Sequence, residues 1–139
     1  MSINKFNSEG YIDPTAYEAL KNIENNRKKK IVFICSPFAG DIESNTRQAR
    51  RYGYFADVKN AVPIIPHLMY PQFLDDNDPE EREMGMNMGL VLLSKCHEMW
   101  VFGDKLSSGM SKEVTKAKQW NIPIRYFTSE CKEVGGSGK

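Results

Sequence analysis

The stretch that decides the fold is residues 31–41, IVFICSPFAGD. Its first five residues are a continuous apolar run rich in β-branched side chains, which is typical of a strand buried on both faces. A turn-rich loop follows, and residues 44–59 then have helical character, with Asp41 or Ser44 able to cap the first turn. Strand, loop and helix in this order predict one unit of a parallel α/β sheet.

The alternation of strands and helices continues toward the C-terminus. A short apolar run at 62–66 holds two prolines, which suit strand ends better than a strand interior. After a polar connection at 67–78, Pro79 opens a helix that ends near Ser94. The last expected elements are a strand at 99–103, a helix at 109–120 and a strand at 123–127. We therefore expect an α/β three-layer sandwich of the flavodoxin or Rossmann-like kind, with a small parallel sheet of roughly four or five strands.

The ends of the chain are expected to lie outside this alternation. Residues 1–30 predict an N-terminal extension with a short helix at 14–27 that packs through one apolar face. That face carries Tyr17, Leu20 and Ile23. Residues 31–130 predict the α/β domain, and residues 131–139, which end in GGSGK, predict a flexible tail.

The composition excludes several classes of function. A chain of 139 residues with 40% hydrophobic residues fits one domain, and a net charge of +1 argues against recruitment by a nucleic acid polymer or a membrane. Cys35, Cys96 and Cys131 lack the C-x-x-C spacing of zinc and redox sites, which indicates a reducing compartment. The sequence shows no signal peptide and no apolar segment of the roughly 18 residues needed to span a bilayer. We expect a cytoplasmic protein.

In a parallel sheet of this kind, ligands bind beyond the carboxyl ends of the strands, which points to the loops at 36–43, 67–78 and 103–110. The third loop ends at a helix start, where free N–H groups and the helix dipole favour an anion. The turn consists of Ser107, Ser108, Gly109 and Met110. It predicts a phosphate-binding turn, with an ordinary serine N-cap as the alternative.

Carboxylates near this turn indicate a chemistry of proton transfer and nucleophilic attack. Glu113 lies on the first turn of the helix, where it either faces the crevice or completes a capping box. Asp104 and the cluster at 75–78 are further carboxylates, and a pair of carboxylates across a sugar is what glycoside cleavage uses. The cluster could equally cap the helix that opens at Pro79. The place of His67 after an apolar strand suits contact with a ligand or transfer of a proton. The alternative is a structural histidine.

Other chemistries lose their support in this sequence. The acidic cluster lacks the D-x-D-x-D-G spacing of a calcium loop, and the first loop carries neither a dinucleotide fingerprint nor a P-loop. Cys35 lies within a strand, where a thiol usually packs as an inert apolar group. We therefore expect neither a metal nor a cofactor.

Several motifs together resemble a known superfamily. ICSPF after the first strand, PIIPH, and S-x-G-x-x-x-E after the third strand resemble the nucleoside 2-deoxyribosyltransferases. More closely, ICSPFAGD, N-x-x-x-A-R-x-Y, PHLMYPQFLDDNDPEER, MGMNMGLVLL and WVFG-x-x-x-S-x-G-M resemble a small branch described as domain of unknown function 4406. The resemblance covers roughly residues 31–127.

This resemblance implies a substrate and roles for individual residues. It implies cleavage or transfer at the base–sugar bond of a nucleoside or nucleotide, with Glu113 as nucleophile and Ser107 at the 5′-phosphate. The first loop, Ser36, Pro37 and Phe38, would line the sugar and base. The aspartate that the superfamily carries before the third strand falls near Met86 or Asn87 here, so Asp104 or the 75–78 cluster would supply the acid.

The resemblance also implies an oligomer, because sites in the superfamily are often completed by a neighbouring subunit. Met84, Met86 and Met88 cannot all face one core from a single helix, so we expect a homo-oligomer. The leading hypothesis is an N-glycosidase or deoxyribosyltransferase-like enzyme. The alternatives are a non-catalytic module that binds or sequesters a nucleotide signal, and an interaction protein that docks through Trp100, Trp120 and the methionines.

Overall fold

The computed structural model describes residues 14–135 and contains one four-stranded sheet in the order β2-β1-β3-β4. The strands are β1 (Ile31–Cys35), β2 (Val62–Ile64), β3 (Glu98–Phe102) and β4 (Ile124–Phe127). Every neighbouring pair is parallel, with Val32 beside both Pro63 and Glu98 in the register of the central strand. The predicted α/β class is confirmed, with a sheet of four strands.

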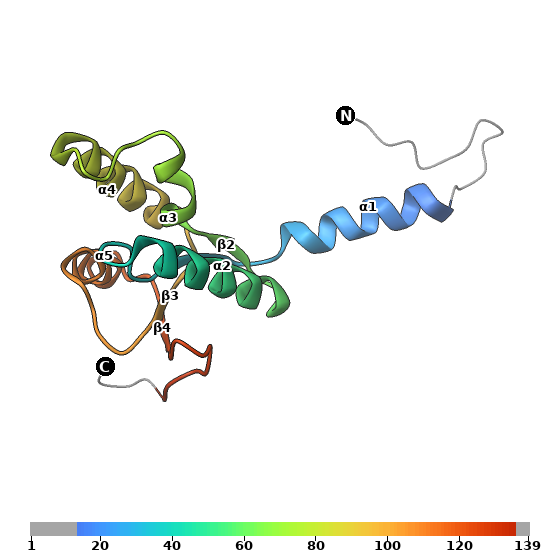
Figure 1. Ribbon diagram of the computed structural model, residues 1–139. Coiled ribbons are helices and arrows are strands. Elements are labelled where there is room, and N and C mark those ends of the chain that lie inside the picture. The colour runs from blue at the N-terminus through green and yellow to red at the C-terminus, as the bar shows by residue number, and fades with distance from the viewer. Residues whose placement is uncertain (1–13, 136–139) are drawn as a thin grey trace.

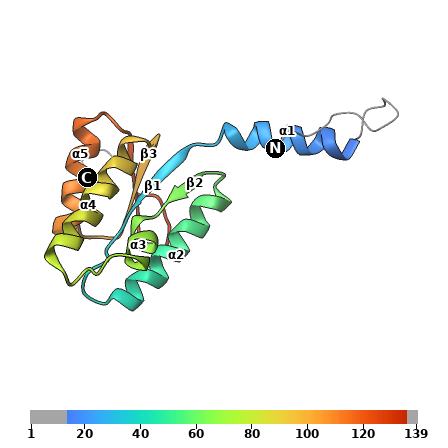
Figure 2. The ribbon, with the colours of Figure 1, turned by 90° about the horizontal axis from the view of Figure 1, so that it is seen from above.

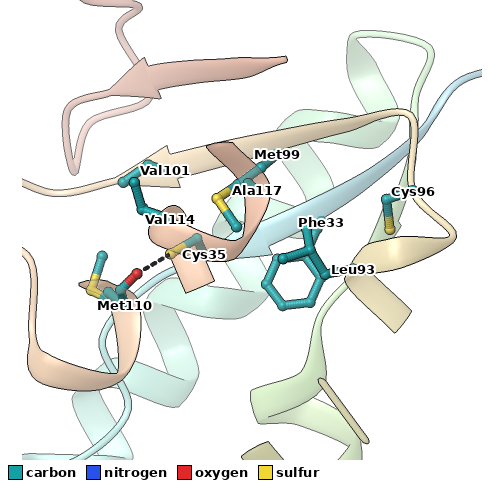
Figure 3. Close-up of a cluster of buried hydrophobic side chains, with 9 residues drawn as sticks. All are labelled: Phe33, Cys35, Leu93, Cys96, Met99, Val101, Met110, Val114 and Ala117. Carbon is teal, nitrogen blue, oxygen red and sulfur yellow. Dashed lines mark hydrogen bonds between the residues drawn. The ribbon is translucent and has the colours of Figure 1, made fainter. Parts of the chain in front are cut away.

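Helices cover both faces of the sheet, so the molecule has three layers (Figure 2). The long helices of the domain are α2 (Ile42–Val58), α4 (Pro79–Ser94) and α5 (Ser108–Gln119). Helix α2 packs Tyr52 and Ala56 on one face, against strand residues that include Trp100 and Phe102. Helices α4 and α5 pack on the other face, around Phe33. Figure 3 shows nine buried side chains of the hydrophobic cluster on the face covered by α4 and α5.

Side chains at the helix ends explain where these helices start and stop. The side chains of Asp41, Asp78 and Ser107 are the N-caps of α2, α4 and α5, and each accepts a hydrogen bond from a backbone N–H of the first turn. Asn60 and Asn121 follow the ends of α2 and α5 with positive φ angles of 68° and 57°, a conformation in which asparagine commonly ends a helix.

The connection at 67–78, expected to be a polar loop, begins with two short helical turns. They are α3 (Pro66–Met69) and η1, a 3₁₀ turn over Tyr70–Gln72. A proline occupies the first or second position of each turn, where its fixed φ suits a helix start. As a result, His67 and Tyr70 belong to ordered helical turns close to the end of β2.

The N-terminal helix has the predicted bounds but not the predicted packing. Helix α1 (Pro14–Arg27) extends away from the sheet and the other helices (Figures 1 and 2). Tyr17 and Ile23, expected to lie on the packing face of this helix, are 42% and 45% exposed. The apolar stripe of this helix is thus not covered by the sheet or by the other described helices, since a short stripe does not specify which surface it meets.

The C-terminal segment is held in place further than expected. Arg125 on β4 makes a two-pronged ion pair with Glu133, with N–O distances of 2.8 and 2.7 Å, and the N–H of Val134 donates to the carbonyl of Tyr126. Residues 131–134, which belong to the segment expected to be a flexible tail, are therefore attached to β4. Residues 136–139 lie outside the described part. None of the described helices is long and apolar enough to cross a membrane.

Candidate functional site

A cavity of about 150 Å³ lies beyond the carboxyl ends of the strands, between α4, the start of α5 and the turns α3 and η1. The structure brings seven of the residues selected from the sequence to its wall. They are Phe38, His67, Ser107, Ser108, Gly109, Met110 and Glu113. These residues come from the loop after β1, from α3, and from the N-cap and first two turns of α5, which all lie at the strand ends, as the strand-end rule predicts.

Three other selected residues do not line this cavity. Ser36 is fully buried at the end of β1, and Pro37 beside it is half-buried. Asp104 is exposed in the loop after β3. The geometry therefore gives no support to a role for Asp104 as the second carboxylate.

Glu113 is a buried carboxylate in the wall of the cavity. Its side chain comes from the second turn of α5, and the residue is only 5% exposed. The thiol of Cys35 donates a hydrogen bond to Oε1 at 3.4 Å. Burial raises the pKa of Glu113 to about 7, although the bond from Cys35 acts in the opposite direction. The carboxyl can therefore exist in both protonation states near neutral pH.

The capping-box alternative for Glu113 is wrong. The N-cap of α5 is Ser107, so the position that a capping box would use is Met110. The expected packing role of Cys35 fits its surroundings, since burial and the neighbouring Glu113 raise the pKa of the thiol well above its usual range. Cys35 is thus a neutral donor to Glu113.

The turn before α5 combines a serine cap with free backbone donors. The hydroxyl oxygen of Ser107 accepts a hydrogen bond from the N–H of Met110 at 3.2 Å, so the ordinary N-cap is present. The next two N–H groups, of Ser108 and Gly109, have no partner within the helix, as at any helix start. Both residues line the cavity, where the positive end of the α5 dipole favours an anion.

The first loop and His67 form a stacked pair. The rings of Phe38 and His67 lie 4.9 Å apart with an interplanar angle of 18°. Burial lowers the pKa of His67, while a hydrogen bond with the Ser36 backbone partly opposes that shift, so the imidazole is neutral at pH 7 and above. The side-chain amide of Asn45 donates to the carbonyls of Phe38 and Ala39 and fixes the loop. Asn45 is the first residue of the N-x-x-x-A-R-x-Y motif, which was the available signal for this role.

Tyr70 and two glycines of α4 also line the cavity and were missed in the sequence. A Cβ on Gly89 would lie 3.8 Å from Tyr70 Cε2 and 4.0 Å from Glu113 Oε2. A Cβ on Gly85 would lie 3.9 Å from the Tyr70 side chain. The G-x-x-x-G spacing of Gly85 and Gly89 on a helix was the available signal, because it leaves a flat strip against which an aromatic ring can pack.

Charged residues of the second loop and of the start of α4 complete the wall. Asp76, Glu81 and Arg82 line the cavity, and Arg82 also lines an adjoining, more open hollow with Lys112. Asp78 caps α4, and Asp75 accepts a hydrogen bond from the N–H of Asn77, so two acidic residues of the cluster serve local structure. The alternative of a helix cap is thus confirmed for Asp78. Among residues 14–135, no three His, Cys, Asp or Glu residues gather as metal ligands would.

Solved structures that are similar to this chain include two deoxyribosyltransferases. A 2-deoxyribosyltransferase from the psychrotolerant bacterium Bacillus psychrosaccharolyticus superposes with a TM-score of 0.60 at 13% identity, over 78% of this chain and 77% of that one. A 2-desoxiribosyltransferase from Leishmania mexicana gives a TM-score of 0.49 at 15% identity, over 71% of this chain and 64% of that one. The first likeness shows that this chain shares the fold of a 2-deoxyribosyltransferase. No curated protein matches the sequence.

One family model matches, and it covers the whole α/β sheet. The match spans residues 30–127, which include β1 through β4 and the loops that line the cavity. The branch expected from the sequence motifs, domain of unknown function 4406, is not confirmed by this match. The chain belongs to the family described as Domain of unknown function (DUF7768).

Proposed function

We propose that this protein binds a nucleoside or nucleotide and cleaves its base–sugar bond, with Glu113 as the nucleophile. The observation that carries the proposal is a buried carboxylate in the wall of a strand-end cavity, one turn from free helix N–H groups. Because burial raises the pKa of Glu113 to about 7, its carboxylate is poorly solvated and reactive when ionised.

The reaction would proceed in two displacements at the anomeric carbon. A carboxylate oxygen of Glu113 forms a bond to that carbon while the bond to the base nitrogen breaks, and its electron pair leaves with the base. A proton from an acid in the site neutralises the departing base. Water, or a second base, then attacks the same carbon, gives its proton to the acid that was deprotonated in the first step, and releases the Glu113 carboxylate. Transfer and hydrolysis thus differ only in the second nucleophile.

Asp76 is the favoured source of the leaving-group proton. It lines the cavity, whereas Asp104 does not. The neutral ring of His67, stacked on Phe38, offers a flat surface for a base.

A 5′-phosphate would be held at the start of α5. The N–H groups of Ser108 and Gly109 and the helix dipole favour an anion there. Arg82 and Lys112 line the hollow that adjoins these residues and supply two cations there, beside the carboxylates of Asp76 and Glu83. These features favour a nucleoside monophosphate over the unphosphorylated nucleoside.

The test is product analysis with purified protein. The protein is incubated with deoxynucleosides, their 5′-monophosphates and dinucleotides of the NAD type, and free base is measured by chromatography. We expect free base from at least one deoxynucleotide, and a loss of roughly three orders of magnitude or more in Glu113→Gln. Asp104→Asn, which alters an exposed carboxylate outside the cavity, is the matched control and should keep full activity. The enzyme proposal fails when no compound yields free base and Glu113→Ala leaves ligand binding unchanged.

A non-catalytic nucleotide-binding module is the second candidate. One observation favours it: the raised pKa of Glu113, about 7, keeps much of the carboxyl protonated at neutral pH, where it donates a hydrogen bond instead of attacking. This candidate predicts a rise in melting temperature with a nucleotide but no turnover. Thermal shift and product analysis on the same samples separate the two candidates.

We also propose that the protein forms a homo-oligomer through α4. Met84 and Val91 on this helix are 51% and 60% exposed, at a spacing of seven residues that puts them on one side of the helix. Met86, by contrast, lines the cavity. An exposed apolar strip next to a ligand site favours a neighbouring subunit that closes the site.

A further inference from the structure

Tyr70 carries a buried hydroxyl that the protein itself leaves without a partner. The residue is 8% exposed, and within the described residues its hydroxyl oxygen accepts and donates no hydrogen bond. Buried hydroxyls nearly always have a partner, because stripping one of water without replacing its hydrogen bonds costs free energy. A hydrogen-bond partner for the Tyr70 hydroxyl must therefore come from a bound molecule.

The ring of Tyr70 is fixed in the wall of the cavity by its packing. It contacts the ring of Phe73 edge to face, with centroids 6.0 Å apart, and it packs against Gly85 and Gly89 of α4. Larger side chains at these two positions would come between the ring and the helix. The 3₁₀ turn that begins at Tyr70 and the two glycines of α4 thus hold the phenol in one place.

The side chains of Tyr70 and Glu113 lie on either side of the space in front of Gly89, which is called the gap below. Tyr70 Cε2, which is bonded to the carbon that bears the hydroxyl, and Glu113 Oε2 both lie within 4.0 Å of the point where a Cβ on Gly89 would stand. Cys35 occupies Oε1 of the carboxylate, so Oε2 is the oxygen on the side of the gap. Burial and the charge of Glu113 raise the pKa of Tyr70, which keeps its proton available for donation.

The second orphaned hydroxyl in the described residues behaves differently. Ser36 Oγ is also buried without a partner, but Ser36 does not line the cavity. Tyr70 is therefore distinguished by having both an unpaired donor and a place in the wall beside the carboxylate.

We propose that Tyr70 is a ligand-binding residue whose hydroxyl donates a hydrogen bond to an oxygen of the sugar, beside the carbon that Glu113 engages. This inference rests on the proposed function for the identity of the ligand. An ionised carboxylate can only accept hydrogen bonds, so a sugar, which is rich in oxygen acceptors, needs a separate donor in the same gap. A base bound against His67 and Phe38 would leave this gap to the sugar.

The test compares Tyr70→Phe with Tyr52→Phe. Both variants remove the phenol oxygen of a buried tyrosine, and Tyr52 lies on the opposite face of the sheet, in the cluster with α2. The probes are 2-deoxyribose 5-phosphate and free adenine, with binding measured by calorimetry and stability by thermal unfolding. We expect Tyr70→Phe to bind the sugar phosphate about tenfold or more weakly and adenine unchanged, with no fall in melting temperature. Tyr52→Phe should bind both probes as the wild type does.

The outcomes separate this inference from the proposed function. Equal binding of the sugar phosphate by Tyr70→Phe and wild type overturns the inference, and so does a clear fall in its melting temperature, which would reveal a partner within the protein. Failure of the wild type to bind the sugar phosphate also overturns it. Sugar-phosphate binding that depends on Tyr70, without release of base from any nucleotide, overturns the proposed catalysis and leaves the inference standing.

Discussion

Glu113 is the site residue at which burial changes the pKa of a group that is proposed to react. Its ordinary pKa of 4.5 rises to about 7 because the folded protein removes the carboxyl from water. The folded state therefore holds a proton more tightly than the unfolded chain does. The sign follows from linkage: this stabilising contribution is fully present below about pH 4.5 and is lost as the pH rises through about 7.

The first prediction concerns Glu113→Gln, which imitates the protonated acid at every pH. Above about pH 7 the variant should be more stable than the wild type by up to about 3 kcal/mol, because it has no buried charge to accommodate. Below about pH 4.5 the two proteins should be equally stable. Denaturant unfolding across this range measures the difference. A difference that does not change with pH would show that Glu113 is solvated in the folded state.

The second prediction distinguishes the two aspartates. Asp76→Asn should lower the rate of base release by about a hundredfold or more while leaving KM little changed, since a general acid acts mainly in the transition state. Asp104→Asn should match the wild type, because Asp104 lies outside the cavity. The measurement is steady-state kinetics on the best deoxynucleotide substrate. Equal effects of the two substitutions would remove Asp76 from the mechanism.

The sequence predicts some residues of the site and not others. Glu113 and the serine turn follow a buried strand and open a helix, so their place at the strand ends follows from topology alone. Tyr70 is not predicted from the sequence, because its segment has the composition of a polar loop and a 3₁₀ turn of three residues leaves no periodic pattern to detect. Asp76 could not be separated from Asp75 and Asp78, since only the folded loop shows which carboxylates are already engaged.

At the scale of elements, the sequence predicts the regular structure well. The predicted bounds of α1 and α4 are those observed, and the strands differ from prediction by two residues or fewer at each end. Prolines, caps and uninterrupted apolar runs are local features, and they decide where these elements start. The exposure of α1 depends instead on contacts between distant parts of the chain, which periodicity does not encode.

The third prediction uses the glycine strip of α4. Gly89→Ala places a methyl group at ordinary contact distance, 3.8 Å from Tyr70 and 4.0 Å from Glu113 Oε2, so nothing must shift. The helix should gain up to about 1 kcal/mol from the better helix former, while the methyl narrows the gap and weakens ligand binding. Thermal unfolding and ligand titration of the same variant measure both effects. Unchanged affinity would mean that the gap is not part of the binding site.

At the scale of the whole molecule, the apolar surface of α4 bears on assembly. The fourth prediction is that Val91→Glu shifts the protein from oligomer to monomer, because a carboxylate cannot be buried without a partner in an apolar interface. Val58→Glu, at a similarly exposed valine on α2, is the matched control and should leave the assembly intact. Sedimentation velocity measures both. A wild type that sediments as a monomer at all accessible concentrations contradicts the proposed oligomer.

The two borders of the sheet restrict how copies of this protein can meet. On one side, β2 is only three residues long and has Pro63, which carries no N–H, at its centre. On the other side, the segment around Glu133 and Val134 pairs with β4, and the ion pair between Arg125 and Glu133 holds it there. Neither border offers a long row of unsatisfied backbone groups on which a foreign strand could continue the sheet, which is how native proteins avoid edge-to-edge aggregation. Continuation of the sheet into a second copy is therefore disfavoured at both edges, and a truncation that removes the pairing at Glu133 would leave the outer edge of β4 unpaired.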